Sequence, residues 1–185
     1  MEYAAAYSPR PHQYFTHLAT ERFKVIVWHR RAGKTIAACN ELLRQVATKP
    51  SGVGAYIGPT FKQTKRVAWD AIKKYGAAYG IQANETELRA DFPNGARIYL
   101  LAAEQYDSIR GMGLDFAVLD ECAMHPRPAW EQVIRPALAD RRGGALFIGR
   151  VDLLLLPALF FLLVFGHAES PPGCGMNQRR CERID

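Results

Sequence analysis

Short apolar runs alternate with helix-forming segments along the first part of this chain. Runs at 24–28, 53–57, 116–119 and 145–148 have the length and the apolar composition of strands. The run at 116–119 is continuously apolar, which is typical of a strand that is buried on both faces. Strands that alternate with helices predict an α/β layer fold, in which helices sandwich a mainly parallel sheet.

The helical segments lie between these runs. Apolar residues recur at helical intervals from Ile36 to Val46, and Pro50 follows the end of this helix. The same spacing predicts helices over 61–79 and 128–138. Lysine and arginine are frequent in the helix at 61–79, a pattern that fits either a solvated face or contact with nucleic-acid phosphates.

Two turn-rich segments complete the pattern. Residues 85–92 and 96–101 flank Asn94-Gly95, a dipeptide that supplies the positive φ angles of a tight turn. This arrangement predicts a β-hairpin or two adjacent strands. Residues 107–113 are punctuated by glycine and predict a loop before the strand at 116–119.

The first strand leads directly into residues 28–35, which read Trp-His-Arg-Arg-Ala-Gly-Lys-Thr. Gly33, Lys34 and Thr35 match the end of the phosphate-loop pattern G-x-x-x-x-G-K-[ST], whereas Trp28 replaces its first glycine. The backbone N–H groups of such a loop and the helix behind it bind the phosphates of a nucleotide. Lys34 would neutralise phosphate oxygens, and the Thr35 hydroxyl would bind Mg²⁺. On this segment alone, a chance Gly-Lys-Thr in an ordinary strand, turn and helix remains open.

Two adjacent acids follow the apolar run at 116–119. Asp120 and Glu121 would stand at the carboxyl edge of the sheet, where ligands of α/β proteins bind. In a nucleotide hydrolase one carboxylate holds the Mg²⁺ shell and another polarises the attacking water. A solvated acidic turn is the alternative, but the upstream loop favours the catalytic interpretation.

Charge and cysteine content narrow the class of protein. The chain has 185 residues and a net charge of +6, which indicates a mild preference for anionic partners. Its four cysteines (Cys39, Cys122, Cys174 and Cys181) lack the short paired spacing of zinc sites and predict free thiols in a reducing compartment. Residues 1–10 lack the features of a secretory signal, so we expect a cytoplasmic protein.

Three motifs together resemble one known family. The segments at 28–35, 109–111 and 118–123 occur in the order, and at about the separations, of the ATPase domain of the terminase large subunit. That subunit is the motor of tailed bacteriophages that pumps DNA into a preformed capsid. The resemblance covers roughly residues 10–149, and the arginine-rich loop without its first glycine is its most specific element.

The resemblance implies a P-loop NTPase fold and a set of residues that bind ATP and Mg²⁺. Thr35 and Asp120 would hold the Mg²⁺, and Gln13 matches a glutamine that reads adenine in the family. The nucleotide-binding set that the resemblance implies is Gln13, Arg31, Ala32, Gly33, Lys34 and Thr35.

The resemblance also implies catalytic roles. Glu121 would activate water, and Arg30 matches an arginine that acts near the γ-phosphate. Arg110 lies where some members place an arginine that reaches the nucleotide of a neighbouring subunit, and such a guanidinium would offset charge on the transferred phosphoryl group. A purely structural Arg110, which would fix its own glycine loop, is equally compatible with the sequence.

The pattern of the family breaks after residue 149. We expect an incomplete P-loop ATPase domain at 1–149 and an aberrant tail at 150–185. Residues 153–165 form an apolar run too short to cross a bilayer comfortably, and the composition that follows predicts disorder. No nuclease-like cluster of acids follows, so a truncated or frameshifted reading frame is our hypothesis.

The sequence thus favours the ATPase domain of a packaging motor that hydrolyses ATP with Mg²⁺. By resemblance, its partners are double-stranded DNA, the portal protein and the small terminase subunit. The complete protein would form a homo-oligomeric ring in the cytoplasm of a bacterial host, without membrane attachment. The alternatives are a helicase-type nucleic-acid motor and a non-catalytic remnant or membrane-associated binding module led by the apolar run.

Overall fold

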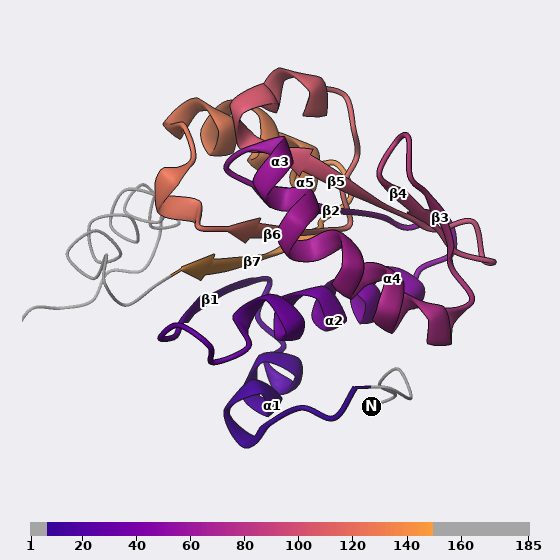
Figure 1. Ribbon diagram of the computed structural model, residues 1–185. Helices are drawn as coiled ribbons and strands as arrows, with labels where there is room; N and C mark the ends of the chain where they lie inside the picture. Colours follow the sequence, from indigo (N-terminus) through magenta and orange to yellow (C-terminus); the bar gives the residue numbers. More distant parts are fainter. Residues whose placement is uncertain (1–6, 150–185) are drawn as a thin grey trace, which may run out of the picture.

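The computed structural model describes residues 7–149, and the expectations for the tail at 150–185 lie outside these residues. The described part of the chain forms one seven-stranded sheet in the order β1-β7-β6-β2-β5-β4-β3 (Figure 1). The strands are β1 Phe23–Val27, β2 Val53–Gly58, β3 Gln82–Asn84, β4 Arg89–Asp91, β5 Arg97–Ala102, β6 Phe116–Asp120 and β7 Gly144–Gly149.

Five of the strands form a parallel core. β1, β7, β6, β2 and β5 are paired in parallel, while β4 and β3 add an antiparallel edge. Every residue of β6 is buried, in agreement with its continuous apolar sequence. The predicted α/β fold with a mainly parallel sheet is therefore confirmed, and so is the antiparallel pairing of the two strands around Asn94-Gly95.

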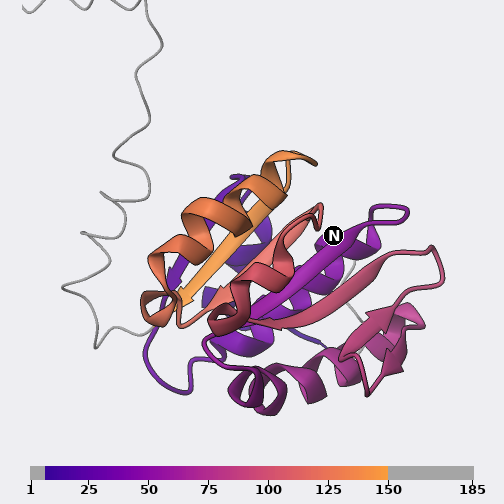
Figure 2. The ribbon, with the colours of Figure 1, turned by 90° about the horizontal axis from the view of Figure 1, so that it is seen from above.

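Helical segments cover both faces of the sheet (Figures 1 and 2). α2 and α4 pack with Leu42, Ile72 and their neighbours on one face, and η5 and α5 pack with Trp130 and Ile134 on the other. The helical segments are α1 Pro11–Leu18, α2 Lys34–Ala47, α3 Phe61–Thr64, η1 Lys65–Trp69, α4 Asp70–Gly76, η2 Ala77–Tyr79, η3 Ala103–Ile109, η4 Cys122–Met124, η5 Ala129–Ile134 and α5 Arg135–Ala139.

Some local expectations need correction. The helix predicted over 61–79 is interrupted by a π-helical turn, η1, and the segment predicted as a loop at 107–113 begins within the short helix η3. The strand predicted within 85–92 is only three residues long and pairs with a further short strand, β3. α1 was not predicted, because its stability comes from buried contacts of Gln13 and His17 rather than from a long amphipathic pattern.

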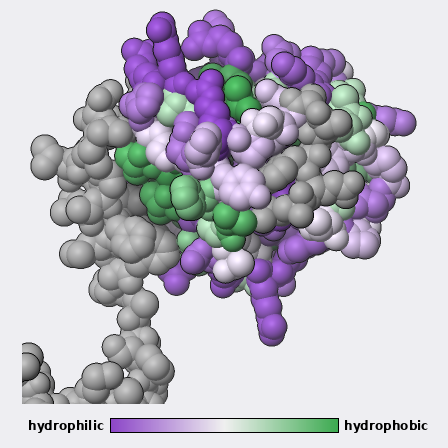
Figure 3. All heavy atoms as spheres, turned by 90° about the horizontal axis from the view of Figure 1, so that it is seen from below, coloured by the Kyte–Doolittle hydropathy of each residue, from purple (hydrophilic) through white to green (hydrophobic). Residues whose placement is uncertain are grey.

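The face that contains α1 includes exposed apolar surface (Figure 3). Phe15 and Leu18 of α1 and Val25 of β1 are exposed hydrophobic residues. Within residues 7–149, β1 pairs only with β7 and therefore forms an edge of the sheet. Across the same residues, no helix has both the length and the apolar character that a membrane crossing requires.

Candidate active site

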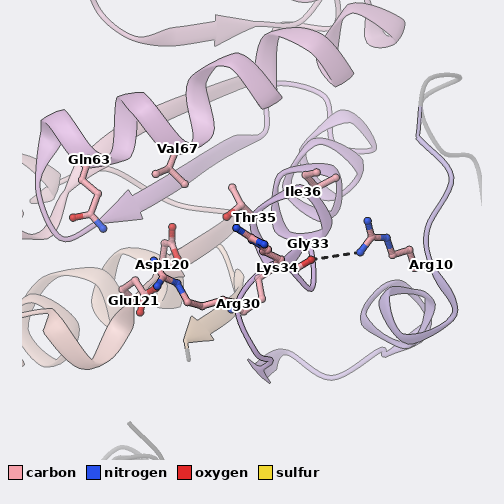
Figure 4. A pocket seen from close by; sticks show the side chains of 11 residues that line it. Arg10, Arg30, Gly33, Lys34, Thr35, Ile36, Gln63, Val67, Asp120 and Glu121 are labelled. Carbon is pink, nitrogen blue, oxygen red and sulfur yellow. Dashed lines mark hydrogen bonds between the residues drawn. The ribbon is translucent and has the colours of Figure 1, made fainter. Parts of the chain in front are cut away.

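A cavity of about 870 Å³ opens at the carboxyl edge of the parallel strands (Figure 4). The loop after β1, the start of α2 and the end of β6 all contribute to it. Ligands of parallel α/β sheets bind at this edge, because the strands end there and the following helices begin there. The lining residues are Arg10, Arg30, Arg31, Gly33, Lys34, Thr35, Ile36, Gln63, Val67, Asp120 and Glu121.

The loop between β1 and α2 has the backbone of a phosphate-binding loop. Gly33 precedes the first residue of α2 with φ 81° and ψ 28°, a left-handed conformation that favours glycine. A Cβ atom at Gly33 would lie 2.5 Å from Nε2 of Gln13, so a side chain is excluded by contact as well. The positive end of α2 therefore faces the cavity through a loop that approaches it closely.

Lys34 lies across this loop. Its Nζ donates to the carbonyl oxygens of Trp28 and His29, at 2.7 Å and 3.1 Å. Trp28 thus serves the loop through its backbone, while its side chain packs against the core and the ring of His12. The missing first glycine is compatible with the loop for this reason.

Asp120 and Glu121 line the same cavity from the opposite side (Figure 4). Asp120 is 8% exposed, and burial raises the pKa of its carboxyl although the Tyr56 hydroxyl, which donates to Oδ2 at 2.8 Å, acts in the other direction. Glu121 has φ 50° and ψ 46°, a left-handed backbone that is costly for a residue with a side chain. This turn brings two consecutive carboxylates to one cavity.

The oxygens that meet here fit a divalent cation. The Thr35 hydroxyl and the Asp120 carboxylate are hard donors of the kind that Mg²⁺ prefers. Within residues 7–149, no three His, Cys, Asp or Glu side chains are grouped as a metal-binding cage. One carboxylate and one hydroxyl, completed by phosphate oxygens and water, are typical of Mg²⁺ sites in nucleotide hydrolases.

His125 and Cys122 follow the acids but have no role that requires the cavity. His125 Nε2 lies 2.8 Å from the carbonyl oxygen of Asp120, and burial lowers the pKa of its imidazole to about 4. Burial also raises the pKa of Cys122 to about 11, so its thiol is held in the neutral form. Both side chains support the turn that follows β6.

Two of the predicted site residues lie outside the cavity. Gln13 is buried behind the loop, where Nε2 donates to the carbonyl oxygens of Gly33 at 3.1 Å and Ala32 at 3.4 Å, and Oε1 accepts from the Arg10 backbone N–H. Arg110 pairs with Asp107 at 2.7 Å and lines a separate cavity of about 210 Å³. The other predicted residues of the site meet at the large cavity, except Ala32, which is buried within the loop.

Sequence reasoning missed five residues of this region. Arg10 donates to the Arg31 carbonyl oxygen at 3.5 Å, as the dashed line in Figure 4 marks, and so adds a third arginine to the cavity. No local pattern predicts this contact, because it joins segments 21 residues apart. The other missed residues are Ile36, Tyr56, Gln63 and Val67.

The charges on the walls of the cavity match a polyphosphate. The cationic residues Arg10, Arg30, Arg31 and Lys34 face an acidic pair across one opening. A parallel sheet, a Gly-Lys-Thr loop that opens a helix, and acids at the end of a neighbouring strand together define the P-loop class of nucleotide-binding proteins.

Comparison with known proteins gives the family within this class. The family model "Terminase large subunit, T4likevirus-type, N-terminal" matches residues 26–146, so the chain belongs to the terminase large subunit family. The terminase large subunit of Thermus virus P23-45 is 29% identical over 194 aligned residues, which cover 93% of this chain and 40% of that protein. The subunit of Thermus phage G20c matches with the same identity and coverage. The chain therefore spans less than half the length of these relatives.

Solved structures agree with this assignment. The ATPase domain of the large terminase of Thermus phage P74-26 is similar with a TM-score of 0.70 and 26% identity, over 80% of this chain and 70% of that one. The large terminase of a second phage, a thermophilic bacteriophage, gives a TM-score of 0.60 at 19% identity, over 70% of this chain and 34% of that one. The second match shows that the fold is shared.

Proposed function

We propose that this domain binds ATP with Mg²⁺ and hydrolyses it to drive the packaging of double-stranded DNA into a phage capsid. The observation that carries the proposal is the meeting of Lys34, Thr35, Asp120 and Glu121 at one cavity. Solved structures of the large terminase of the thermophilic bacteriophage, in complex with ADP and with ATP-γ-S, support a nucleotide ligand.

Each residue has a role that follows from its position. The N–H groups at the start of α2 and the Lys34 ammonium would bind the β- and γ-phosphates. Thr35 and Asp120 would hold Mg²⁺, which supplies charge neutralisation at the phosphates when it is bound. Glu121, next to Asp120 but in a different backbone conformation, would orient the attacking water and accept its proton.

The arginines would divide the remaining work. Arg30 and Arg31 line the cavity, and Arg30 would offset charge that develops on the γ-phosphoryl group. Arg110 points to its own Asp107 rather than to the cavity of its own subunit, an arrangement compatible with presentation to a neighbouring subunit in a ring. In the complete protein, the further partners would be the portal protein and the small terminase subunit, in the cytoplasm of the bacterial host.

The substitution Lys34→Ala tests the nucleotide site. It removes the charge that faces the phosphates and barely changes helix propensity. Binding of a fluorescent ATP analogue to the native chain and to Lys34→Ala should differ by about 10- to 100-fold, as expected for charge-assisted hydrogen bonds of about 1.5–3 kcal/mol. Lys74→Ala, which removes an equal charge from the exposed face of α4, is the matched control.

Two outcomes would contradict the proposal. One is a native chain that shows no saturable binding of ATP in the presence of Mg²⁺. The other is equal affinity in the native chain and in Lys34→Ala. A parallel assay of phosphate release with Glu121→Gln separates binding from chemistry, because this change should abolish hydrolysis while nucleotide remains bound.

A further inference from the structure

A single phenol hydroxyl lies in the otherwise apolar core beneath the cavity. Tyr56 belongs to β2, is fully buried, and packs in one cluster with Ala38, Cys39 and Leu42 of α2. A buried hydroxyl has a free-energy cost unless it forms hydrogen bonds. Phenylalanine would fill the same space without that cost, so packing alone does not account for the hydroxyl.

The hydroxyl of Tyr56 reaches the first acid of the site. β2 and β6 are neighbours in the sheet, and Tyr56 is paired with Val118, two residues before Asp120. The ring extends towards the carboxyl edge, and its hydroxyl donates to Asp120 Oδ2 at 2.8 Å. A hydrogen bond to a carboxylate is among the stronger kinds in proteins.

The same hydroxyl is a hydrogen-bond partner of the Thr35 side chain. A phenol has only one hydrogen, and Tyr56 donates that hydrogen to Asp120. Thr35 must therefore donate to the phenol oxygen, which leaves its lone pairs available to the cavity that Thr35 and Asp120 both line. Lone pairs are what a divalent cation needs from a hydroxyl ligand.

We propose that Tyr56 is a positioning residue that holds the Thr35 hydroxyl and the Asp120 carboxylate in the orientation needed to bind Mg²⁺ together. This inference rests on the proposed function, because it concerns the same nucleotide site. Tyr56 does not line the cavity, so it acts through its two partners rather than by contact with nucleotide. The hydroxyl joins α2 and β6, the elements that carry the two oxygens.

The test compares the affinity for ATP-γ-S in excess Mg²⁺ with that in EDTA. We expect Tyr56→Phe to reduce the gain in affinity due to Mg²⁺ by about tenfold, which corresponds to about 1.4 kcal/mol, while the affinity in EDTA stays within about twofold of native. Tyr75→Phe removes a hydroxyl from a residue that packs against the same core but lies outside the cavity, and it should retain the native gain. A merely structural Tyr56 would change both affinities equally.

The outcomes separate this inference from the proposed function. A native chain without Mg²⁺-dependent binding of ATP-γ-S would overturn both. A native chain with that binding, together with an unchanged gain in Tyr56→Phe, would overturn only the role of Tyr56.

A second variant tests the idea even if Tyr56→Phe fails to fold. Thr35→Ser keeps the hydroxyl but removes the methyl group that restricts the threonine rotamer. If Tyr56 holds the hydroxyl in place, the serine should keep the gain due to Mg²⁺ within about threefold of native. Loss of that gain in Thr35→Ser would show that threonine orients its own hydroxyl and would contradict the proposal.

Discussion

Two buried carboxylates of this domain have opposite surroundings. Glu41, in the middle of α2, is fully buried and accepts five hydrogen bonds from four side chains. Asp120, at the end of β6, is almost as buried but has the Tyr56 hydroxyl as its side-chain donor and opens onto the cavity. The donors to Glu41 are His17, Lys24, Arg44 and Gln45.

The pKa values of these carboxyls move in opposite directions. Burial acts to raise the pKa of Glu41, but the hydrogen bonds from its donors and the charge of Lys24 outweigh it and hold the pKa at about 2. Burial raises the pKa of Asp120, and its hydrogen bonds do not compensate. A fully satisfied carboxylate joins structural elements, whereas an incompletely satisfied one is ready to bind a cation.

The largest effect should come from breaking the network at Glu41. Glu41→Gln would leave the buried ammonium of Lys24 without its countercharge, and we expect a loss of about 3–5 kcal/mol in the free energy of unfolding. Glu131→Gln, at an exposed position, should change it by less than about 0.5 kcal/mol. Urea unfolding followed by circular dichroism measures both.

Asp120→Asn provides the other half of this comparison. The amide oxygen can still accept from Tyr56, and a charge that burial penalises is removed. The free energy of unfolding should therefore stay near the native value or rise, while Mg²⁺-dependent nucleotide binding is lost. A large destabilisation by Asp120→Asn together with a small one by Glu41→Gln would reverse the assignment of roles.

Acid should weaken the Glu41 network in a defined pH range. A carboxyl whose pKa falls on folding contributes stability that is present above its ordinary pKa, 4.5 here, and is lost as pH falls towards about 2. This difference corresponds to about 3 kcal/mol. We expect the native chain to lose stability over this range more steeply than Glu41→Gln does, and urea midpoints at several pH values provide the measurement. Parallel curves for the two proteins would count against the network.

The smallest effect concerns Gln13, whose predicted role was to read adenine. Both ends of its amide are engaged by backbone atoms next to the loop, so we expect Gln13→Ala to weaken binding of ATP and GTP alike, by about fivefold. Competition of the two nucleotides against a fluorescent analogue measures this effect. A loss confined to ATP would instead support the adenine-reading role.

Local sequence was sufficient to predict the parts of the site that are continuous in the chain. The apolar run at 116–119, its two acids, and the Gly-Lys-Thr at the start of α2 follow from composition and spacing. The contact of Tyr56 with Asp120 depends on which strands are neighbours, and the placement of β2 beside β6 is a property of the whole sheet. Gln13 was named from sequence, but its position behind the loop depends on a short helix whose stability is tertiary.

The left-handed backbone at Glu121 has a consequence for engineering this domain. Such a conformation costs a non-glycine residue about 1–3 kcal/mol, whereas asparagine tolerates it better. A search for heat-resistant variants that ignores turnover would therefore favour replacement of this glutamate. Resistance to heat and the capacity to activate water are opposed at this one position.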